Sequence, residues 1–190
     1  VYTDVIASSE LQKHITETNQ EVKKRLEQLA KKTRLAQSSN AADHASSRLG
    51  LPQFLVVNVF IPDKPKGSCM VLYFELTPET IAELQSDSDY SPALSLLCGF
   101  VERCKASSPQ LEKDRFKVIA KCTNADEIKC EYLMSSALKS SKKGKPMLIN
   151  NTGCIFYRSN DPPVLEIDVD VDQFSKLKWA LGSTSLPEML

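Results

Sequence analysis

Glycine is scarce in this sequence, and the glycine-rich motifs that hold phosphate groups are missing. Six glycines occur in 190 residues. Neither GxGxxG nor GxxxxGK followed by Ser or Thr is present, so no dinucleotide site or P-loop is predicted. The nucleophile motif GxSxG is missing as well. The sequence therefore disfavours nucleotide-binding enzymes with a parallel sheet and hydrolases that use a GxSxG nucleophile motif.

The sequence also lacks an excess of either charge and any long apolar run. Lys plus Arg and Asp plus Glu number 24 each, so no overall field attracts nucleic acid, and none is expected as a partner. No apolar run reaches the roughly 18 residues of a membrane span. The first ten residues do not have the pattern of a signal peptide. We expect a cytoplasmic chain that could associate peripherally with membranes.

Paired cysteines with nearby histidines, the usual signs of a zinc site, are missing too. The six cysteines contain no CxxC pair, and His14 and His44 are distant from them in sequence. We therefore expect no metal and no cofactor. Cys69, Cys98 and Cys154 sit in apolar runs, where free thiols pack as small hydrophobic groups, and this favours a reducing compartment.

Residues 1–50 are predicted as an amino-terminal helical segment and a linker. Apolar and neutral residues recur every three or four positions over residues 11–36, which is typical of an amphipathic helix. Thr18 and Glu21 could instead form a capping box and start a shorter helix. The basic outer face favours a solvated surface, with a short coiled coil or a membrane-surface helix as alternatives. Residues 37–50 are small and polar, and predict a loop or linker.

Residues 51–190 are predicted as the core of a single globular domain. Two apolar runs, FLVVNVFIP (54–62) and CMVLYFEL (69–76), flank a turn-rich stretch and predict a hairpin. The first run is apolar on both faces, so we expect it at the centre of a sheet. Its exception is Asn58, which either finds hydrogen-bond partners within the protein or presents a polar handle to a ligand.

Two helices and further strands follow. Thr77 is a good helix cap before Pro78, which predicts a helix over 78–85, and a second helix is expected over 92–105. Further strands are predicted over 115–122 and within 146–172. Residues 125–140 could form a strand followed by a helix, and residues 173–182 are amphipathic. Strands in pairs and helices in blocks indicate an α+β fold, with a mainly antiparallel sheet of about five to seven strands packed with helices. A START-like helix-grip is one such arrangement.

The stretch LEIDVDVD places an acidic residue at every second position. In a strand, one face carries Leu165, Ile167, Val169 and Val171, and the other carries Glu166, Asp168, Asp170 and Asp172. A calcium loop starting at Asp168 fails, because Gln173 stands where glycine must turn and Trp179 stands where Glu is needed. We predict a solvated or salt-bridged acidic face, with a catalytic carboxylate pair as the alternative.

Four stretches together resemble a known family: FLVVNVFIP, CMVLYFEL, RFKVIAKC and KPMLINNTGCIFYRSNDPPVLEIDVDVDQFSKLKWALGS. Their order and wording resemble the carboxy-terminal domain of the plant Enhanced Disease Resistance Two proteins, over roughly residues 54–183. LEIDVDV is the most specific element. In that family the domain, whose function is unknown, follows pleckstrin homology and START domains. The resemblance therefore implies a role in lipid binding or at membranes, and it does so only through these neighbouring domains. It supplies no catalytic residues.

The leading functional hypothesis is a non-enzymatic regulatory module that binds a lipid or another apolar small molecule, or that docks on an anionic membrane surface. A cavity between the sheet and the helices would hold the ligand. Its candidate lining residues are Val57, Asn58, Val59, Leu72, Phe74, Ile167 and Val169. The same side chains could form an ordinary filled core. Membrane contact would fall to a basic loop, with Lys139, Lys142, Lys143 and Lys145.

Two other function classes stay open. One is a protein–protein interaction domain that uses the amino-terminal helix or the acidic strand. The other is a hydrolase that uses the acidic row, in which one carboxyl group must hold its proton near neutral pH. The sequence does not set the oligomeric state.

Overall fold

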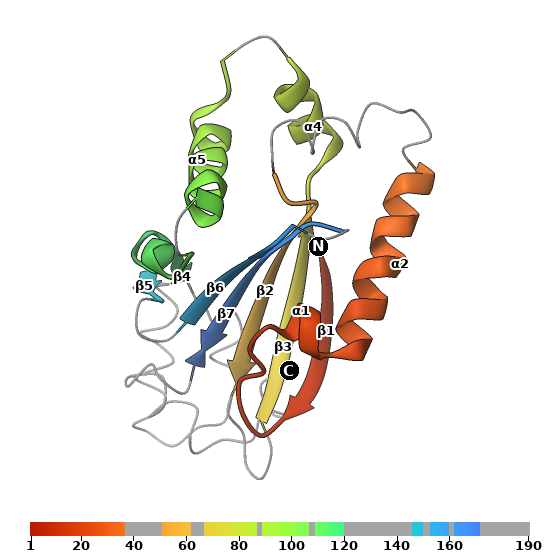
Figure 1. Ribbon diagram of the computed structural model, residues 1–190, viewed down its shortest axis with the longest axis vertical. Coiled ribbons are helices and arrows are strands. Elements are labelled where there is room, and N and C mark those ends of the chain that lie inside the picture. Colours follow the sequence, from red (N-terminus) through yellow and green to blue (C-terminus); the bar gives the residue numbers. More distant parts are fainter. Residues whose placement is uncertain are drawn as a thin grey trace, which may run out of the picture.

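A five-stranded sheet forms the centre of the molecule (Figure 1). The computed structural model describes residues 1–36, 51–61, 67–86, 89–106, 109–119, 146–149, 153–159 and 162–171. The strand order is β1-β3-β2-β7-β6. These strands are β1 (Tyr2–Ser8), β2 (Phe54–Ile61), β3 (Gly67–Glu75), β6 (Gly153–Arg158) and β7 (Val164–Asp170). A separate two-stranded sheet joins β4 (Lys117–Ile119) to β5 (Pro146–Leu148).

The pairing of the strands confirms the α+β class with a mainly antiparallel sheet. β2 and β3 form the predicted hairpin, with Phe54 opposite Glu75. β1 pairs antiparallel with β3, and β6 pairs antiparallel with β7. The one parallel pair of this sheet joins β2 to β7 and places Asn58 beside Asp168. β2 therefore lies at the centre of the sheet, as its apolar sequence predicts.

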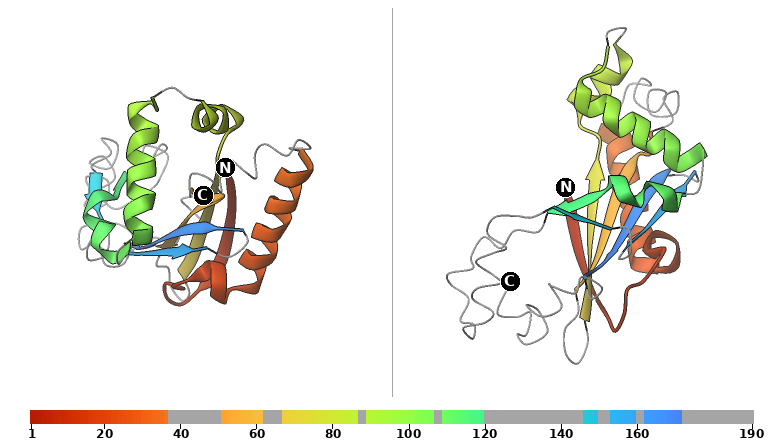
Figure 2. Two further views of the ribbon diagram at one scale, coloured as in Figure 1. Left: turned by 45° about the horizontal axis from the view of Figure 1, so that its top comes forward. Right: turned by 90° about the vertical axis from the view of Figure 1, so that its left-hand side faces the viewer.

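Helices cover both faces of the sheet (Figures 1 and 2). α1 (Ile15–Thr18) and α2 (Gln20–Ala36) lie on one face. They share a core with alternate residues of the central strands, including Val22, Leu26, Phe54, Val56, Val71 and Tyr73. The other face carries α4 (Pro78–Gln85), α5 (Pro92–Ala106) and the 3-10 helix η1 (Pro109–Arg115). Its core includes Leu84, Leu94, Val101, Ile155, Leu165 and Ile167.

The helix after the hairpin begins where its sequence predicts. The Thr77 hydroxyl accepts a hydrogen bond from the backbone N–H of Thr80 at 3.3 Å, and Pro78 occupies the first turn. Such caps satisfy backbone donors that a helix start leaves free. α5 ends one residue beyond the predicted 92–105. Both helices follow from local signals.

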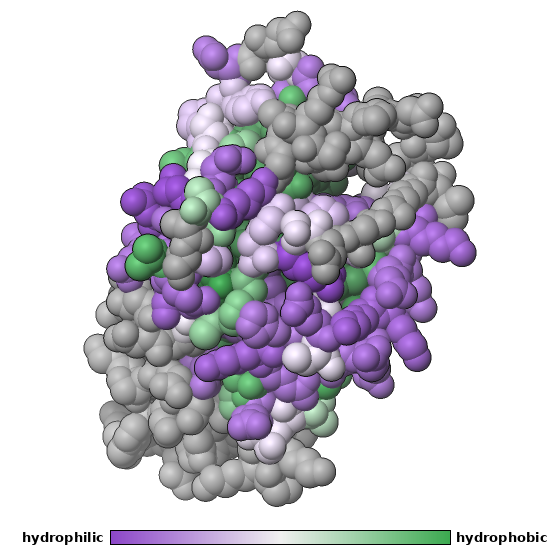
Figure 3. Space-filling view, viewed as in Figure 1, coloured by the Kyte–Doolittle hydropathy of each residue, from purple (hydrophilic) through white to green (hydrophobic). Residues whose placement is uncertain are grey.

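The predicted long helix over residues 11–36 is wrong in its first part. The chain is extended at Asn19, and its side-chain oxygen accepts hydrogen bonds from the N–H groups of Glu21 and Val22. Asn19, and not Thr18, therefore caps α2. α2 otherwise matches the solvated-face interpretation, because Val22 and Leu26 are buried while its outer side is hydrophilic (Figure 3).

Residues 1–36, which the sequence predicts as a helical segment ahead of the core, contribute β1 and α2 to that core. The strand expected over 115–122 is described only as β4, in the small sheet. The predictions for 37–50, 125–140 and 173–182 lie outside the described residues. No helix within the described ranges is long and apolar enough to cross a membrane.

Candidate functional site

Strand β7 is buried on both faces, which overturns the prediction of a solvated acidic row. Glu166 is 2% exposed and Asp168 is 0% exposed. The reason is that β7 lies between β2 and β6, while α1 and the residues before it lie over the acidic side. Asp170 is half-buried, and Asp172 lies outside the described residues.

The two buried carboxyl groups bind the backbone at the start of α1. Glu166 Oε1 accepts from the Ile15 N–H at 2.7 Å, and Oε2 accepts from the N–H of Thr16 at 3.1 Å and from its hydroxyl. Asp168 Oδ2 accepts from the His14 N–H at 3.2 Å. Carboxylates suit this position, because the first N–H groups of a helix have no partner within it.

Asn58 completes this group, which we call the carboxylate clamp (Glu166, Asp168 and Asn58). Its amide nitrogen donates to Asp168 Oδ1 at 2.7 Å and to the Gln12 carbonyl at 2.9 Å. Asn58 is fully buried. Of the two roles that the sequence leaves open, the contacts match the structural one, since this amide ties the segment before α1 to the centre of the sheet.

Within the clamp, the pKa of Asp168 is strongly raised. Burial, together with the neighbouring Glu166 charge, raises the pKa of Asp168 from 3.8 to about 8. The Asn58 amide and the His14 N–H act in the opposite direction. Asp168 is therefore mostly protonated at neutral pH, as expected when two close carboxyl groups leave water together.

The carboxyl groups of the clamp are well supplied with hydrogen-bond donors, whereas the buried Oδ1 of Asn58 has no hydrogen-bond partner among the described residues. Each of the four carboxyl oxygens accepts at least one hydrogen bond from the backbone or from Asn58 or Thr16. No group of three or more metal-ligating side chains occurs among the described residues. Four cysteines, Cys69, Cys98, Cys104 and Cys154, are free thiols.

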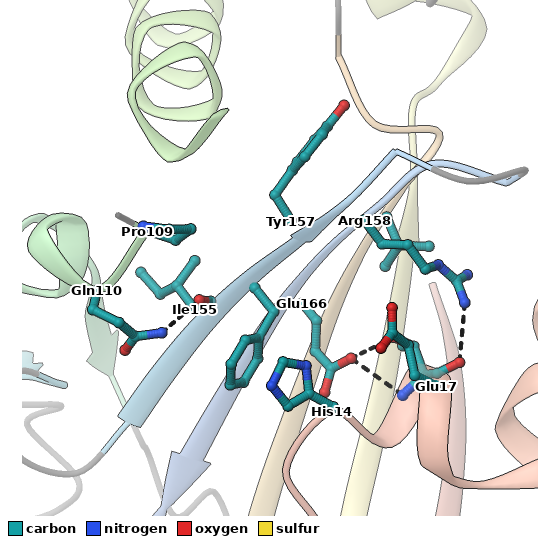
Figure 4. A pocket seen from close by; sticks show the side chains of 11 residues that line it. His14, Glu17, Pro109, Gln110, Ile155, Tyr157, Arg158 and Glu166 are labelled. Atoms are coloured by element: carbon teal, nitrogen blue, oxygen red, sulfur yellow. Dashed lines mark hydrogen bonds between the residues drawn. The ribbon is translucent and has the colours of Figure 1, made fainter. Parts of the chain in front are cut away.

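A pocket of about 310 Å³ with a mixed polar and apolar lining lies beside the clamp, between α1, η1, β6 and β7 (Figure 4). The His14 ring lies against Phe156, with ring centres 3.3 Å apart. The Arg158 guanidinium donates to the carbonyls of Thr16 and Pro162 at 3.1 and 3.4 Å. Gln110 donates to the Ile155 carbonyl at 2.7 Å. These hydrogen bonds join α1 and η1 to the sheet. The buried Nε of Arg158 has no hydrogen-bond partner among the described residues.

An apolar pocket of about 200 Å³ lies on the opposite face of the sheet, near the amino-terminal end of β2. It is formed by residues 51–53, the adjoining ends of β2, β3 and β7, the start of α4, and α5. Its apolar lining consists of Leu51, Pro52, Leu55, Phe74, Leu76, Leu97, Val101 and Leu165. Its polar residues are Gln53, Glu75, Thr77 and Thr80. Leu55, Phe74, Leu76 and Leu97 are half-buried, so this apolar surface is only partly covered.

The structure divides the predicted ligand-binding residues between the two faces. The register places Val57, Val59, Leu72, Phe74, Ile167 and Val169 on the face of α4 and α5. Asn58 points to the other face, into the clamp. Phe74 alone among the seven lines the apolar pocket. The four predicted membrane-surface lysines lie outside the described residues.

Sequence reasoning missed most of the apolar pocket because it concentrated on the middle of the strands. The pocket uses strand ends and the segment Leu51-Pro52-Gln53, where no period-two pattern exists. The signal that was available is Leu76, an apolar residue directly before the helix cap at Thr77. Apolar residues at such junctions often cover the end of a core.

Fold and site together define a class: an α+β domain with a mostly antiparallel sheet, helices on both faces and an apolar pocket at one end. The chain belongs to the family described as Protein ENHANCED DISEASE RESISTANCE 2, C-terminal, whose sequence model matches residues 1–185. This match confirms the resemblance seen in the sequence. No curated protein and no solved structure matched the chain.

Proposed function

We propose that this chain is a non-enzymatic regulatory module that binds the apolar part of a lipid in the apolar pocket. The observation that carries the proposal is the partly covered surface formed by Leu55, Phe74, Leu76 and Leu97. A filled core would leave no such space, because protein interiors pack as densely as organic crystals. Covering this surface with a ligand contributes about 25 cal/mol for each Å² of apolar area removed from water.

The pocket volume limits what can enter. Whole drug-sized ligands occupy pockets of roughly 300–1,000 Å³, which exceeds the 200 Å³ available here. An apolar cavity of roughly 150 Å³ already accepts benzene. The pocket therefore accommodates the end of one acyl chain or a single ring, while the rest of the ligand lies outside.

Peripheral membrane association would deliver such a ligand. Leu96 is 74% exposed on α5 and precedes Leu97, which lines the pocket. An exposed leucine beside an apolar pocket favours contact with a lipid surface, since its side chain gains by leaving water. The predicted lysine loop would add attraction to anionic lipids, at about 1 kcal/mol for each lysine near the surface.

Filling the pocket tests the proposal. Native mass spectrometry and calorimetric titration with monolauroylglycerol, below its micellar concentration, would measure binding to the purified chain. Leu97→Trp should reduce the affinity at least tenfold, because the indole occupies the acyl position. Leu96→Trp is the matched control and should change the affinity less than twofold. Equal losses in both variants, or no binding by the unmodified chain, would contradict the proposal.

A further inference from the structure

The described helices cover only part of the sheet face that carries α4 and α5. On its β6 and β7 side, Ile155, Ile167 and Val169 are fully buried. Toward the other edge, the side chains of β2 and β3 on this face are half-buried, and Val5 of β1 is 60% exposed. α5 and η1 lie at the β6 edge, away from β1 (Figures 1 and 2). We call the remaining surface the open apolar face, and it consists of Val5, Val57, Val59, Met70 and Leu72.

The open apolar face does not have the composition of a solvated sheet surface. Where one face of an antiparallel sheet meets water, that face is usually polar. Here none of the side chains that β1, β2 and β3 present on this face is charged. The hydrophobic cluster under α4 and α5 includes Val57 and Val59 but, among the described residues, neither Met70 nor Leu72. A contiguous apolar surface of this kind indicates a docking surface.

Strand β7 brings the chain to the end of this face. Asp170 lies beside Phe60 of β2 in the parallel register, and Phe60 is opposite Cys69 of β3, which is opposite Ile6 of β1. The residues after Val171 therefore start at that end of the sheet, three strand spacings or roughly 14 Å from β1. About five extended residues span this distance, so the chain beyond β7 reaches the whole face.

The sequence that follows β7 has the pattern of a partner for an apolar surface. Within QFSKLKWALG, Phe174, Leu177 and Leu181 recur at spacings of three and four, which places them on one side of a helix. Ser175 and Lys176 belong to the opposite side. A helix of ten residues is about 15 Å long, close to the three strand spacings between β7 and β1. Docking its apolar side removes two apolar surfaces from water and leaves its lysines solvated.

Residues 120–145 are less suited to this surface. They connect β4 to β5, which pair with each other in the small sheet at the β6 side of the molecule (Figure 1). Both ends of that connection are therefore fixed at the edge opposite β1. Residues 173–182 instead leave from β7, next to β2. Covalent attachment gives them a high effective concentration at the open apolar face, which favours them over a separate molecule.

From this geometry we infer that residues 173–182 dock as a helix on the open apolar face, with Phe174, Leu177 and Leu181 against the sheet. The occupant of this face is thus a segment of the same chain. This docking is independent of lipid binding in the apolar pocket, since it uses the part of the sheet that the pocket leaves open.

A pair of tryptophan reporters tests the docking. Trp179 is the single tryptophan of the chain, so Trp179→Phe provides a background without tryptophan. In that background, Leu177→Trp and Ser175→Trp place an indole on the apolar side and on the outer side of the segment. Acrylamide should quench the fluorescence of the Leu177→Trp variant roughly threefold less than that of the Ser175→Trp variant, because a packed side chain is shielded from solutes. Equal quenching of the two variants would overturn the docking.

A charge on the sheet identifies the surface that shields the reporter. Met70→Asp, added to the Leu177→Trp variant, should raise the quenching to that of the Ser175→Trp variant, since burying an unpaired carboxylate is costly. Leu111→Asp, at a leucine of η1 that is 70% exposed, is the matched control and should leave the quenching unchanged. Far-UV circular dichroism checks that each variant is folded, and Met70→Gln serves the same comparison if Met70→Asp is not.

Two further outcomes would also overturn the inference. Shielding of the Leu177→Trp reporter that persists with Met70→Asp or Met70→Gln would place the segment on another surface. Shielding that disappears on dilution would show that the open apolar face receives the segment of a second copy. Neither result bears on lipid binding in the apolar pocket, which the Leu97→Trp variant tests separately.

Discussion

Alternate residues of strand β7 point to its two faces, and the two faces have different roles. On the α1 face, Glu166 and Asp168 have all their carboxyl oxygens hydrogen-bonded in a fully buried cluster. On the α5 face, Leu165 borders an apolar pocket that is only partly covered. On the polar face the carboxyl groups fix the position of α1, and the pocket beside them is bordered by polar side chains. On the apolar face the pocket is bordered mainly by apolar side chains. The clamp therefore has a structural role on one side of the strand, and the apolar pocket on the other side is where we propose that a ligand binds.

The largest expected effect is on the polar face. Glu166→Ala removes the acceptor for the Ile15 and Thr16 N–H groups and leaves them buried without partners. We expect a loss of about 3–5 kcal/mol in the free energy of unfolding, measured by urea denaturation. The control is Glu102→Ala, since that exposed residue has only a surface ion pair with Lys105 and should lose less than about 1 kcal/mol. A loss below 1 kcal/mol for Glu166→Ala would show that the clamp does not hold α1.

A smaller effect concerns the pH dependence of stability. The pKa of Asp168 is about 8 in the folded protein, above its ordinary 3.8. Between these values the folded state keeps a proton that the unfolded chain has released. The resulting stabilisation is complete below about pH 4 and is lost as the pH rises toward 8. In Asp168→Asn the side chain is neutral throughout, so this dependence disappears.

Urea denaturation at several pH values would measure this difference. The unfolding free energy of the unmodified chain should fall by roughly 1–3 kcal/mol relative to Asp168→Asn between pH 5 and 8. Asp114→Asn, which removes an exposed carboxyl group, controls for the loss of a charge as such. Parallel curves for the unmodified chain and Asp168→Asn would show that Asp168 does not keep a proton in the folded protein.

The smallest effect is expected on the apolar face. Leu97→Phe adds volume where the pocket has room, so the unfolding free energy should change by less than about 1 kcal/mol. Ile167→Phe, at a fully buried position of the same face, should cost about 1–3 kcal/mol through overpacking. Thermal denaturation of both variants gives the comparison. Equal costs would mean that the pocket is as tightly packed as the core.

Local signals in the sequence predicted those parts of the fold whose causes are local. Thr77 and Pro78 mark the start of α4 at neighbouring positions in the sequence. Two apolar runs on either side of a turn indicate the β2–β3 hairpin. β1 escaped prediction because it is an edge strand whose outer residues stay exposed, including Val5 at 60%. The helical period continues across Asn19 and favoured one long helix, while the alternative of a shorter helix placed its cap one residue early, at Thr18.

The candidate site was less predictable, because its partners are distant in sequence. An alternating acidic strand has the same pattern whether its acidic face meets water or buried donors. Glu166 is buried because it accepts a hydrogen bond from the Ile15 N–H, and Ile15 is 151 residues away in the sequence. The apolar pocket depends on how strand ends, a connecting segment and two helices meet. Period-two patterns indicate which face a residue shares, but not where packing leaves a gap.

The parallel pairing of β2 with β7 has a consequence for how the chain reaches its native state. β2 and β3 can pair early, since only a short connection separates them. The edge of β2 that faces β7 must wait for residues 110 positions further along. Contacts of such long range form slowly, so a nascent chain exposes an unpaired, strongly apolar strand edge until Val164–Asp170 has been synthesised. Any truncation before residue 164 should leave that edge open to pairing with other chains.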